Sequence, residues 1–201
     1  MIAILDYGIG NLKSIYNMFK KVGVESLITS DIEEIKKANK YLLPGVGSFD
    51  HGINSLKNAP FFETLEKEVL ENKKPILGIC LGMQLLTNSS EEGKEKGLGW
   101  IDAQTIKFDL EDKSLSIPHM GWNKTNPTNT NDVFKNLEDN RFYFVHSYHV
   151  VCNNEKNILA TANYGQTFTC SIYKDNIYGV QFHPEKSHKF GMQLLKNFGD
   201  L

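Results

Sequence analysis

The sequence predicts an α/β protein: an open, mostly parallel, doubly wound sheet with helices on both faces and antiparallel strand additions in the C-terminal half. Two observations support this fold class. In the first half of the chain, short apolar runs alternate with amphipathic stretches, the order expected of parallel strands joined by helices. In the second half, strand-like runs follow one another with turn residues between them, which is typical of antiparallel neighbours.

Short apolar runs in the first half predict the parallel strands. Each is followed by a polar residue, a turn or a helical stretch, and each is short enough to be fully buried between helices. They are Ile2 to Leu5, Ser26 to Thr29, Tyr41 to Leu43 and Pro75 to Ile79.

The stretches between these runs predict helices. Asp31, followed three residues later by Glu34, is typical of a helix N-terminus. Another helix is expected from Phe61 to Glu71, directly after Pro60. An earlier helix is indicated by apolar residues at helical spacing before a C-terminal glycine, Gly23. These residues are Leu12, Ile15, Tyr16, Phe19 and Val22.

The second half is expected to add antiparallel strands and one closing helix, Phe190 to Phe198. The segment from Asn123 to Asn140 is rich in Asn, Thr and Pro and is expected to be a surface loop. The predicted strands are Gln104 to Phe108, Arg141 to Val151, Leu159 to Ala162, Thr167 to Tyr173 and Ile177 to Phe182.

Length and composition limit the possible functions. The 201 residues fit a single domain, residues 1–201, with an ordinary balance of 40% hydrophobic and 23% charged residues. The net charge of −2, without a basic stripe, argues against a nucleic-acid partner. No apolar run approaches the roughly 20 residues that span a bilayer. With no signal peptide and only three cysteines, we expect a cytoplasmic protein.

The strongest chemical motif lies at Cys80. The segment Gly78-Ile79-Cys80-Leu81-Gly82 follows a buried strand and precedes a helical run, the pattern of a nucleophile elbow with sulfur in place of oxygen. Glycines two positions away on each side permit the sharp turn, and backbone N–H groups at the helix start can hold an oxyanion. The alternative, a small buried hydrophobic cysteine, is the commoner role of a free cysteine.

A cysteine nucleophile needs a base and a group that orients the base. His183 ends an apolar strand, two residues before Glu185, so both side chains can point the same way. His146 and His149 lie on an aromatic strand and are weaker candidates for the base. No His, Cys, Asp or Glu spacing indicates a structural zinc site, and we expect neither metal nor cofactor.

Six sequence blocks, in order along nearly the whole chain, carry a resemblance to a known family. They are DYGIGNLKS from Asp6, LPGVGSF from Leu43, PILGICLGMQLL from Pro75, PHMGWN from Pro118, YFVHSY from Tyr143 and GVQFHPEKS from Gly179. The chain resembles the class I glutamine amidotransferases and, more narrowly, the glutaminase subunits of histidine biosynthesis. The resemblance implies their doubly wound α/β fold and a Cys-His-Glu triad.

The resemblance also implies residue roles. Cys80 attacks the carboxamide of glutamine, His183 acts as general base and then acid, and Glu185 orients His183. The oxyanion is held by the N–H of Leu81 and one N–H of the turn Gly45, Val46 and Gly47. The implied substrate-binding residues are Gln84, Glu92, His146, Ser147 and Tyr148.

The implied partner is a (β/α)8-barrel synthase subunit that receives the ammonia within a heterodimer. The residues matching family positions at or near the docking surface are Asn11, Trp122, Tyr143 and Lys186. Each of them is also compatible with an ordinary surface or packing role.

Two departures leave the ammonia acceptor open. Trp100 to Ala103 stands where an apolar residue and Pro-Gly are expected, and His188 stands where a glycine is expected. One alternative is a paralogous glutaminase that supplies another synthase, for example in amidation of a bacterial surface sugar. Another is a non-catalytic regulatory or docking subunit, although an intact triad argues against it.

Overall fold

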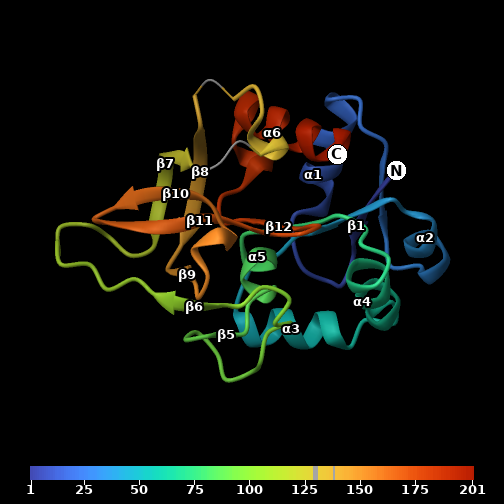
Figure 1. The fold of residues 1–201 in the computed structure, drawn as a ribbon, viewed down its shortest axis with the longest axis horizontal. Coiled ribbons are helices and arrows are strands. Elements are labelled where there is room, and N and C mark those ends of the chain that lie inside the picture. Colours follow the sequence, from blue (N-terminus) through green and yellow to red (C-terminus); the bar gives the residue numbers. More distant parts are fainter. Residues whose placement is uncertain (129–130, 138) are drawn as a thin grey trace.

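The computed structural model describes residues 1–128, 131–137 and 139–201. One mixed sheet runs through the molecule in the order β2-β1-β3-β4-β12-β11-β10-β7-β8. Its parallel part lies between two layers of helices, and its antiparallel part extends away from them (Figure 1). The fold class predicted from the sequence is therefore confirmed.

The parallel part matches the predicted strands almost to the residue. It is formed by β2 (Ser26–Thr29), β1 (Ile2–Leu5), β3 (Lys40–Leu43), β4 (Ile76–Ile79) and β12 (Ile177–Val180). The expectation that the run containing β12 is an antiparallel addition is wrong in part. β12 is antiparallel to β11 but parallel to β4, with Val180 opposite Ile79. β12 thus joins the two parts of the sheet.

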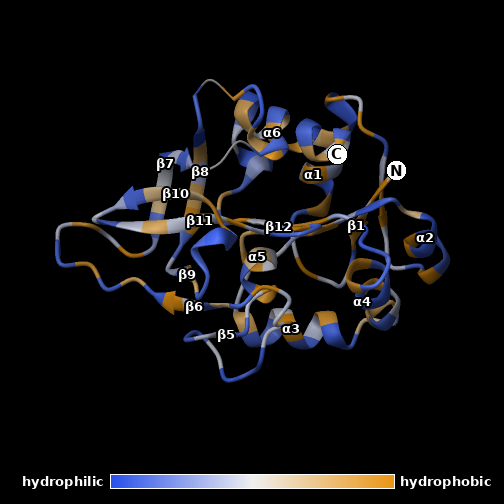
Figure 2. Cartoon of the chain, viewed as in Figure 1, coloured by the Kyte–Doolittle hydropathy of each residue, from blue (hydrophilic) through white to orange (hydrophobic). Residues whose placement is uncertain are grey.

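Helices cover both faces of the parallel part. On one face lie α1 (Leu12–Lys21) and α6 (His188–Asp200), and on the other α2 (Ile32–Lys37), α3 (Phe49–Lys57), α4 (Phe62–Leu70) and α5 (Leu81–Leu85). Asp31 caps α2 by accepting from the backbone N–H groups of Glu33 and Glu34, as its spacing predicts. α3 was not predicted. The helices turn their apolar residues toward the sheet (Figure 2).

The antiparallel part begins with β11 (Gln166–Lys174), β10 (Ile158–Tyr164), β7 (His119–Pro127) and β8 (Arg141–His146). A branch adds β9 (Tyr148–Cys152), β6 (Ala103–Lys107) and β5 (Ser89–Ser90), and short 3-10 turns lie at Asp132–Phe134, Glu155–Asn157 and Pro184–Lys186.

Two predictions in this part are corrected. The segment predicted as a loop from Asn123 to Asn140 starts inside β7, where Lys124 and Asn126 are exposed and Thr125 is buried; positions 129, 130 and 138 lie outside the described residues. The run Arg141 to Val151 is two strands, because the chain bends at Ser147 and β8 and β9 pair with different neighbours.

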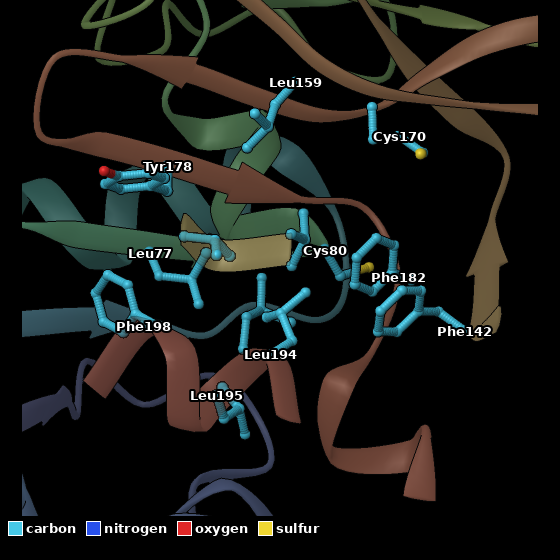
Figure 3. Packing of buried hydrophobic residues seen from close by; sticks show 14 of the residues in the cluster. Leu77, Cys80, Phe142, Leu159, Cys170, Tyr178, Phe182, Leu194, Leu195 and Phe198 are labelled. Atoms are coloured by element: carbon cyan, nitrogen blue, oxygen red, sulfur yellow. The ribbon is translucent and has the colours of Figure 1, made fainter. Parts of the chain in front are cut away.

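The core lies on both faces of the sheet because side chains alternate along each strand. Ile2 and Ile4 face α1 and α6, whereas Ala3 and Leu5 face the opposite helices. Figure 3 shows the cluster on the α1 and α6 side near Cys80, where Leu194 and Phe198 of α6 lie between the helix and the sheet. Among the described residues, no helix has both the length and the apolar character to cross a membrane.

Candidate active site

Cys80 occupies a strained turn between β4 and α5. Its φ of 53° and ψ of −110° are unusual for a residue with a side chain. Its backbone N–H donates to the carbonyl of Val180 in β12 at 2.8 Å, which holds the turn against the sheet. A Cβ at Gly82 would lie 2.0 Å from the carbonyl oxygen of Leu43, so only glycine fits there. The nucleophile elbow predicted from the two glycines is therefore present as a backbone geometry.

His183 and Glu185 meet beside this turn. His183 follows the end of β12, and its Nδ1 lies 2.7 Å from Oε1 of Glu185. The 3-10 turn Pro184–Lys186 brings the carboxylate back onto the ring. Burial alone would lower the pKa of His183, but hydrogen bonds and charge interactions with Cys80 and Glu185 outweigh it and raise the pKa to about 10. The three side chains are thus brought together as the sequence predicts.

A cavity of about 350 Å³ opens above Cys80 and His183. This volume suits a small ligand such as an amino acid. Of the residues predicted to bind substrate or oxyanion, most line it: Val46, Gly47, Leu81, Gln84, Glu92, His146, Ser147 and Tyr148. Lys186, predicted at the docking surface, lies at the same cavity.

Two polar side chains in this cavity are held by the surrounding protein. Glu92 Oε2 accepts from the backbone N–H of Phe49 at 2.9 Å, at the start of α3. Asp50 holds the same loop by accepting from the backbone N–H groups of Lys94 and Glu95. Gln84 Nε2 donates to Gln181 Oε1 at 3.0 Å. An anionic group and an amide are therefore fixed on the cavity wall.

The ring of His146 does not have a free nitrogen for substrate. Its Nε2 lies 3.0 Å from Nδ1 of His119, and its Nδ1 lies 2.8 Å from the carbonyl oxygen of Tyr148. His146 is therefore at the cavity, as predicted, with its hydrogen-bonding capacity already used inside the protein.

Gln181 is a site residue that the sequence reasoning missed. Its side chain is buried, and Nε2 donates toward the sulfur of Cys80 at 3.6 Å. The available signal was its position two residues before His183 in an extended segment, which directs both side chains to the same side.

The turn from Pro44 to Gly47 packs directly on the elbow. A Cβ at Gly45 would lie 2.4 Å from the backbone nitrogen of Gly82, and the hydroxyl of Tyr7 donates to the carbonyl of Pro44. Val46 is 46% exposed at the cavity. The turn is thus beside the nucleophile, while its part in binding an oxyanion stays a prediction.

Three of the residues predicted at the docking surface lie together: the rings of Trp122 and Tyr143, with the ammonium group of Lys186 beside them. Trp122 is 47% exposed, and its ring lies edge-on to Tyr143 with centroids 6.3 Å apart. The Nζ of Lys186 lies 5.9 Å from the centre of the Tyr143 ring. Asn11 is exposed at the start of α1. Within the described residues, no group of three His, Cys, Asp or Glu side chains could hold a metal ion.

Comparison with known proteins assigns the family. The profile described as "Glutamine amidotransferase class-I" matches residues 3–200. Imidazole glycerol phosphate synthase subunit HisH 2 of Methanococcus maripaludis is 59% identical over 199 residues, covering 98% of each chain. The protein of the same name from Pseudomonas aeruginosa is 47% identical and matches over 100% of both chains.

Solved structures agree on the fold. PurLQS from Thermotoga maritima superposes with a TM-score of 0.73 at 18% identity, covering 99% of this chain and 97% of that one. A glutamine amidotransferase from the same organism gives a TM-score of 0.64 at 15% identity, covering 99% and 82%. The chain belongs to the class I glutamine amidotransferase family. It is a glutamine amidotransferase whose curated relatives include the imidazole glycerol phosphate synthase subunits named above.

Proposed function

We propose that this chain is the glutaminase subunit of an imidazole glycerol phosphate synthase, and that it works in histidine biosynthesis. It hydrolyses glutamine and passes ammonia to a (β/α)8-barrel synthase subunit. The observation that carries the proposal is the meeting of Cys80 and His183 at one cavity, with Glu185 bonded to His183 behind it. The full-length similarity to subunits of that name supports the choice of pathway.

The proposed chemistry follows from the three side chains. The raised pKa of His183 favours the proton on that ring, so the sulfur of Cys80 bonds to the carboxamide carbon of glutamine with the proton already held by His183. The C–N bond then breaks, and the nitrogen leaves as ammonia with the proton from His183. Water attacks the thioester with His183 as base, the C–S bond breaks, and glutamate and the free thiol are formed. Glu185 keeps the His183 ring oriented throughout, through its contact with Nδ1.

Charge explains the proposed recognition of glutamine. The carboxylate of Glu92 suits the α-ammonium group of the substrate, because a charge-assisted hydrogen bond is stronger than a neutral one. Gln84 and the backbone at Ser147 and Tyr148 provide neutral polar partners. The N–H groups of Leu81 and of the turn Gly45 to Gly47 lie beside Cys80 and suit the oxyanion.

The proposed docking face consists of Trp122, Tyr143 and Lys186, together with Asn11. Met120, on the same strand as Trp122, is 61% exposed, and large exposed apolar side chains on one strand suit a protein partner. The required free thiol of Cys80 fits a reducing cytoplasm.

A second candidate differs only in the acceptor of ammonia. His188, which replaces the expected glycine, stacks on Trp122 with ring centroids 5.6 Å apart and planes 8° apart. This departure therefore lies on the proposed docking face, where a change in partner would require a change in shape. The candidate is a paralogous glutaminase that supplies another synthase, such as one that amidates a surface sugar.

The deciding experiment measures glutamate release from glutamine by this chain mixed with a candidate barrel protein. The assay is run with and without the phosphoribulosyl-formimino carboxamide ribonucleotide, and the Cys80→Ala chain serves as the blank. A large rise that needs both the barrel and the ribonucleotide supports the histidine pathway. Hydrolysis indifferent to both keeps the glutaminase and favours the second candidate, whereas no hydrolysis under any condition rejects both.

A further inference from the structure

A chain of hydrogen bonds runs through the antiparallel part and ends at the cavity wall. His119 of β7 and His146 of β8 are cross-strand partners, and their rings meet through Nδ1 and Nε2 at 3.0 Å. At one end, Asn123 Nδ2 lies 3.3 Å from His119 Nε2 and also donates to the carbonyl of Asn163. At the other end, His146 Nδ1 meets the carbonyl of Tyr148.

The direction of each bond in this chain is determined by its ends. A carbonyl only accepts, so His146 must carry its proton on Nδ1 and, when neutral, must accept on Nε2. His119 must then donate from Nδ1 and accept on Nε2 from the amide of Asn123. Both rings are buried, and burial lowers the pKa of His119 to about 4 and that of His146 to about 3. Both rings are therefore uncharged at neutral pH, as this arrangement of donors and acceptors requires.

The aromatic surroundings keep the first ring in place. His119 is stacked between Tyr164 and Phe144, with centroid distances of 4.1 and 4.9 Å. His119 is 3% exposed and does not line the cavity of Cys80. The hydrogen-bonded route from His119 to the cavity wall runs through His146, while Pro118, next to His119 in the chain, lines the cavity itself.

The far end of the chain lies where the cavity wall is made. β8 ends at His146 and β9 begins at Tyr148, so the backbone bends at Ser147 between strands that have different neighbours. The bond from His146 to the carbonyl of Tyr148 spans this bend, and that carbonyl also lies 3.4 Å from Gln84 Nε2. The bend is thus held by the side chain of His146 together with one backbone bond, from the N–H of Phe108 to the carbonyl of Ser147 at 3.1 Å.

We infer that His119 is a positioning residue: by donating to His146 it holds the bend at Ser147 and Tyr148 in the shape that receives glutamine. The inference rests on the proposed function, since glutamine is the ligand of that cavity. It extends the site to a side chain on β7 that does not reach the substrate.

Two substitutions at one position separate this role from simple packing. In His119→Asn, the amide nitrogen takes the place of Nδ1 and can still donate to His146. In His119→Gln, the amide lies one bond further out, near the former Nε2, and the donor is lost. His149→Gln is the matched control, because His149, like His119, packs on the ring of Phe168 but bonds to Gln166.

The experiment measures KM and kcat for glutamine with the full chain and its barrel partner, and the backbone amide NMR shifts of Ser147 and Tyr148 in the chain itself. We expect His119→Gln to raise KM about tenfold, the worth of one aligned hydrogen bond, with little change in kcat. His119→Asn and His149→Gln are expected to stay within about threefold of the unsubstituted chain. The amide shifts should move in His119→Gln and stay in His119→Asn.

The amide shifts make the result independent of turnover. If the amide shifts of Ser147 and Tyr148 changed equally in His119→Asn and His119→Gln, or changed in neither, the positioning role of His119 would be overturned. This conclusion would hold even if the chain released no glutamate. A different outcome is that the unsubstituted chain releases no glutamate while the amide shifts still differ between His119→Asn and His119→Gln. That result would reject glutamine as the substrate and keep the role of His119 in positioning the cavity wall.

Discussion

The parallel and antiparallel parts of the sheet contribute to the site in different ways. The strands β1 and β4 are buried at every position, and Cys80 follows directly where β4 ends. In β7 and β8, buried and more exposed positions alternate, and the core there contains histidine and aromatic rings. The parallel part places the reacting groups through chain geometry, since the carboxyl edge of such a sheet is where ligands bind. The antiparallel part shapes the pocket through side-chain hydrogen bonds.

The largest expected effect tests the parallel part. Cys80→Ala should lower glutamine hydrolysis by about 10⁴-fold or more, because the nucleophile is lost. The fold should survive, since the substitution removes only one sulfur atom from the core. Glutamate release and the melting temperature check both statements. Cys152→Ala, a half-buried cysteine in β9, is the matched control and should keep its activity.

Supplying ammonium salt should restore product formation by the Cys80→Ala chain with its barrel partner. Rescue is expected because only the ammonia supply is removed. A well-folded complex that stays inactive with ammonium would contradict a separate ammonia acceptor.

The second prediction compares a glycine from each part. In Gly82→Ala, the added Cβ would lie 2.0 Å from the carbonyl of Leu43, which belongs to the backbone and cannot rotate away. We expect a loss of about 1–3 kcal/mol in the free energy of unfolding, together with loss of glutaminase activity as the elbow shifts.

Gly165→Ala, in the turn between β10 and β11, provides the comparison. Its φ is +69° and its Cβ would meet the end of the Leu115 side chain at 2.8 Å, which can move. We expect a similar loss of about 1–2 kcal/mol from the left-handed backbone, with activity retained. Denaturant unfolding and glutamate release on both variants test this, and equal activity losses would contradict the assignment of the elbow to Cys80.

The smallest effect is a pH dependence that distinguishes the two parts. Burial lowers the pKa of His119 and His146 to about 4 and 3, so the unfolded chain takes up protons near pH 6.5 while the folded chain does not. Their contribution to stability is present above about pH 6.5 and is lost as the pH falls toward these values. His183 behaves oppositely: its pKa is raised to about 10, so its contribution is lost as the pH rises through that value.

Hydrogen exchange at about pH 7.5 and about pH 5 measures this difference strand by strand. Protection should fall in β7 and β8 by about 1–2 kcal/mol and fall less in β1 and β3. His51→Asn, at an exposed histidine, should leave the pH dependence unchanged. A uniform loss of protection over both parts would contradict the assignment to buried histidines.

Sequence reasoning succeeds where one physical pattern dominates. β1 and β2 were predicted to the residue and β3 and β4 to within one. β1, β3 and β4 are largely buried on both faces and so are nearly continuous apolar runs, whereas β2 is a partly buried strand at the edge of the sheet. The meeting of Cys80, His183 and Glu185 was also predictable, since glycines mark the elbow and His183 and Glu185 are separated by one residue.

The features that the sequence did not predict all depend on contacts with residues distant in the sequence. β7 was obscured by its Asn, Thr and Pro content, which is compatible with a strand whose alternate residues face water. The direction in which β12 pairs with β4 follows from topology, and periodicity is the same for either direction. Gln181 and His119 act through uncharged hydrogen bonds with residues far along the chain, for which local composition provides no signal.

The position of β12 between β4 and β11 also sets an order of events during protein synthesis. Residues 177–180 leave the ribosome long after β4, yet Ile177 must pair with Ile76 before the edge of β4 is covered. The bond from Cys80 to the carbonyl of Val180 forms in the same step. A nascent chain therefore carries Cys80 without His183, and glutamine hydrolysis has to wait until the segment from β12 to Glu185 has been made and has paired with β4.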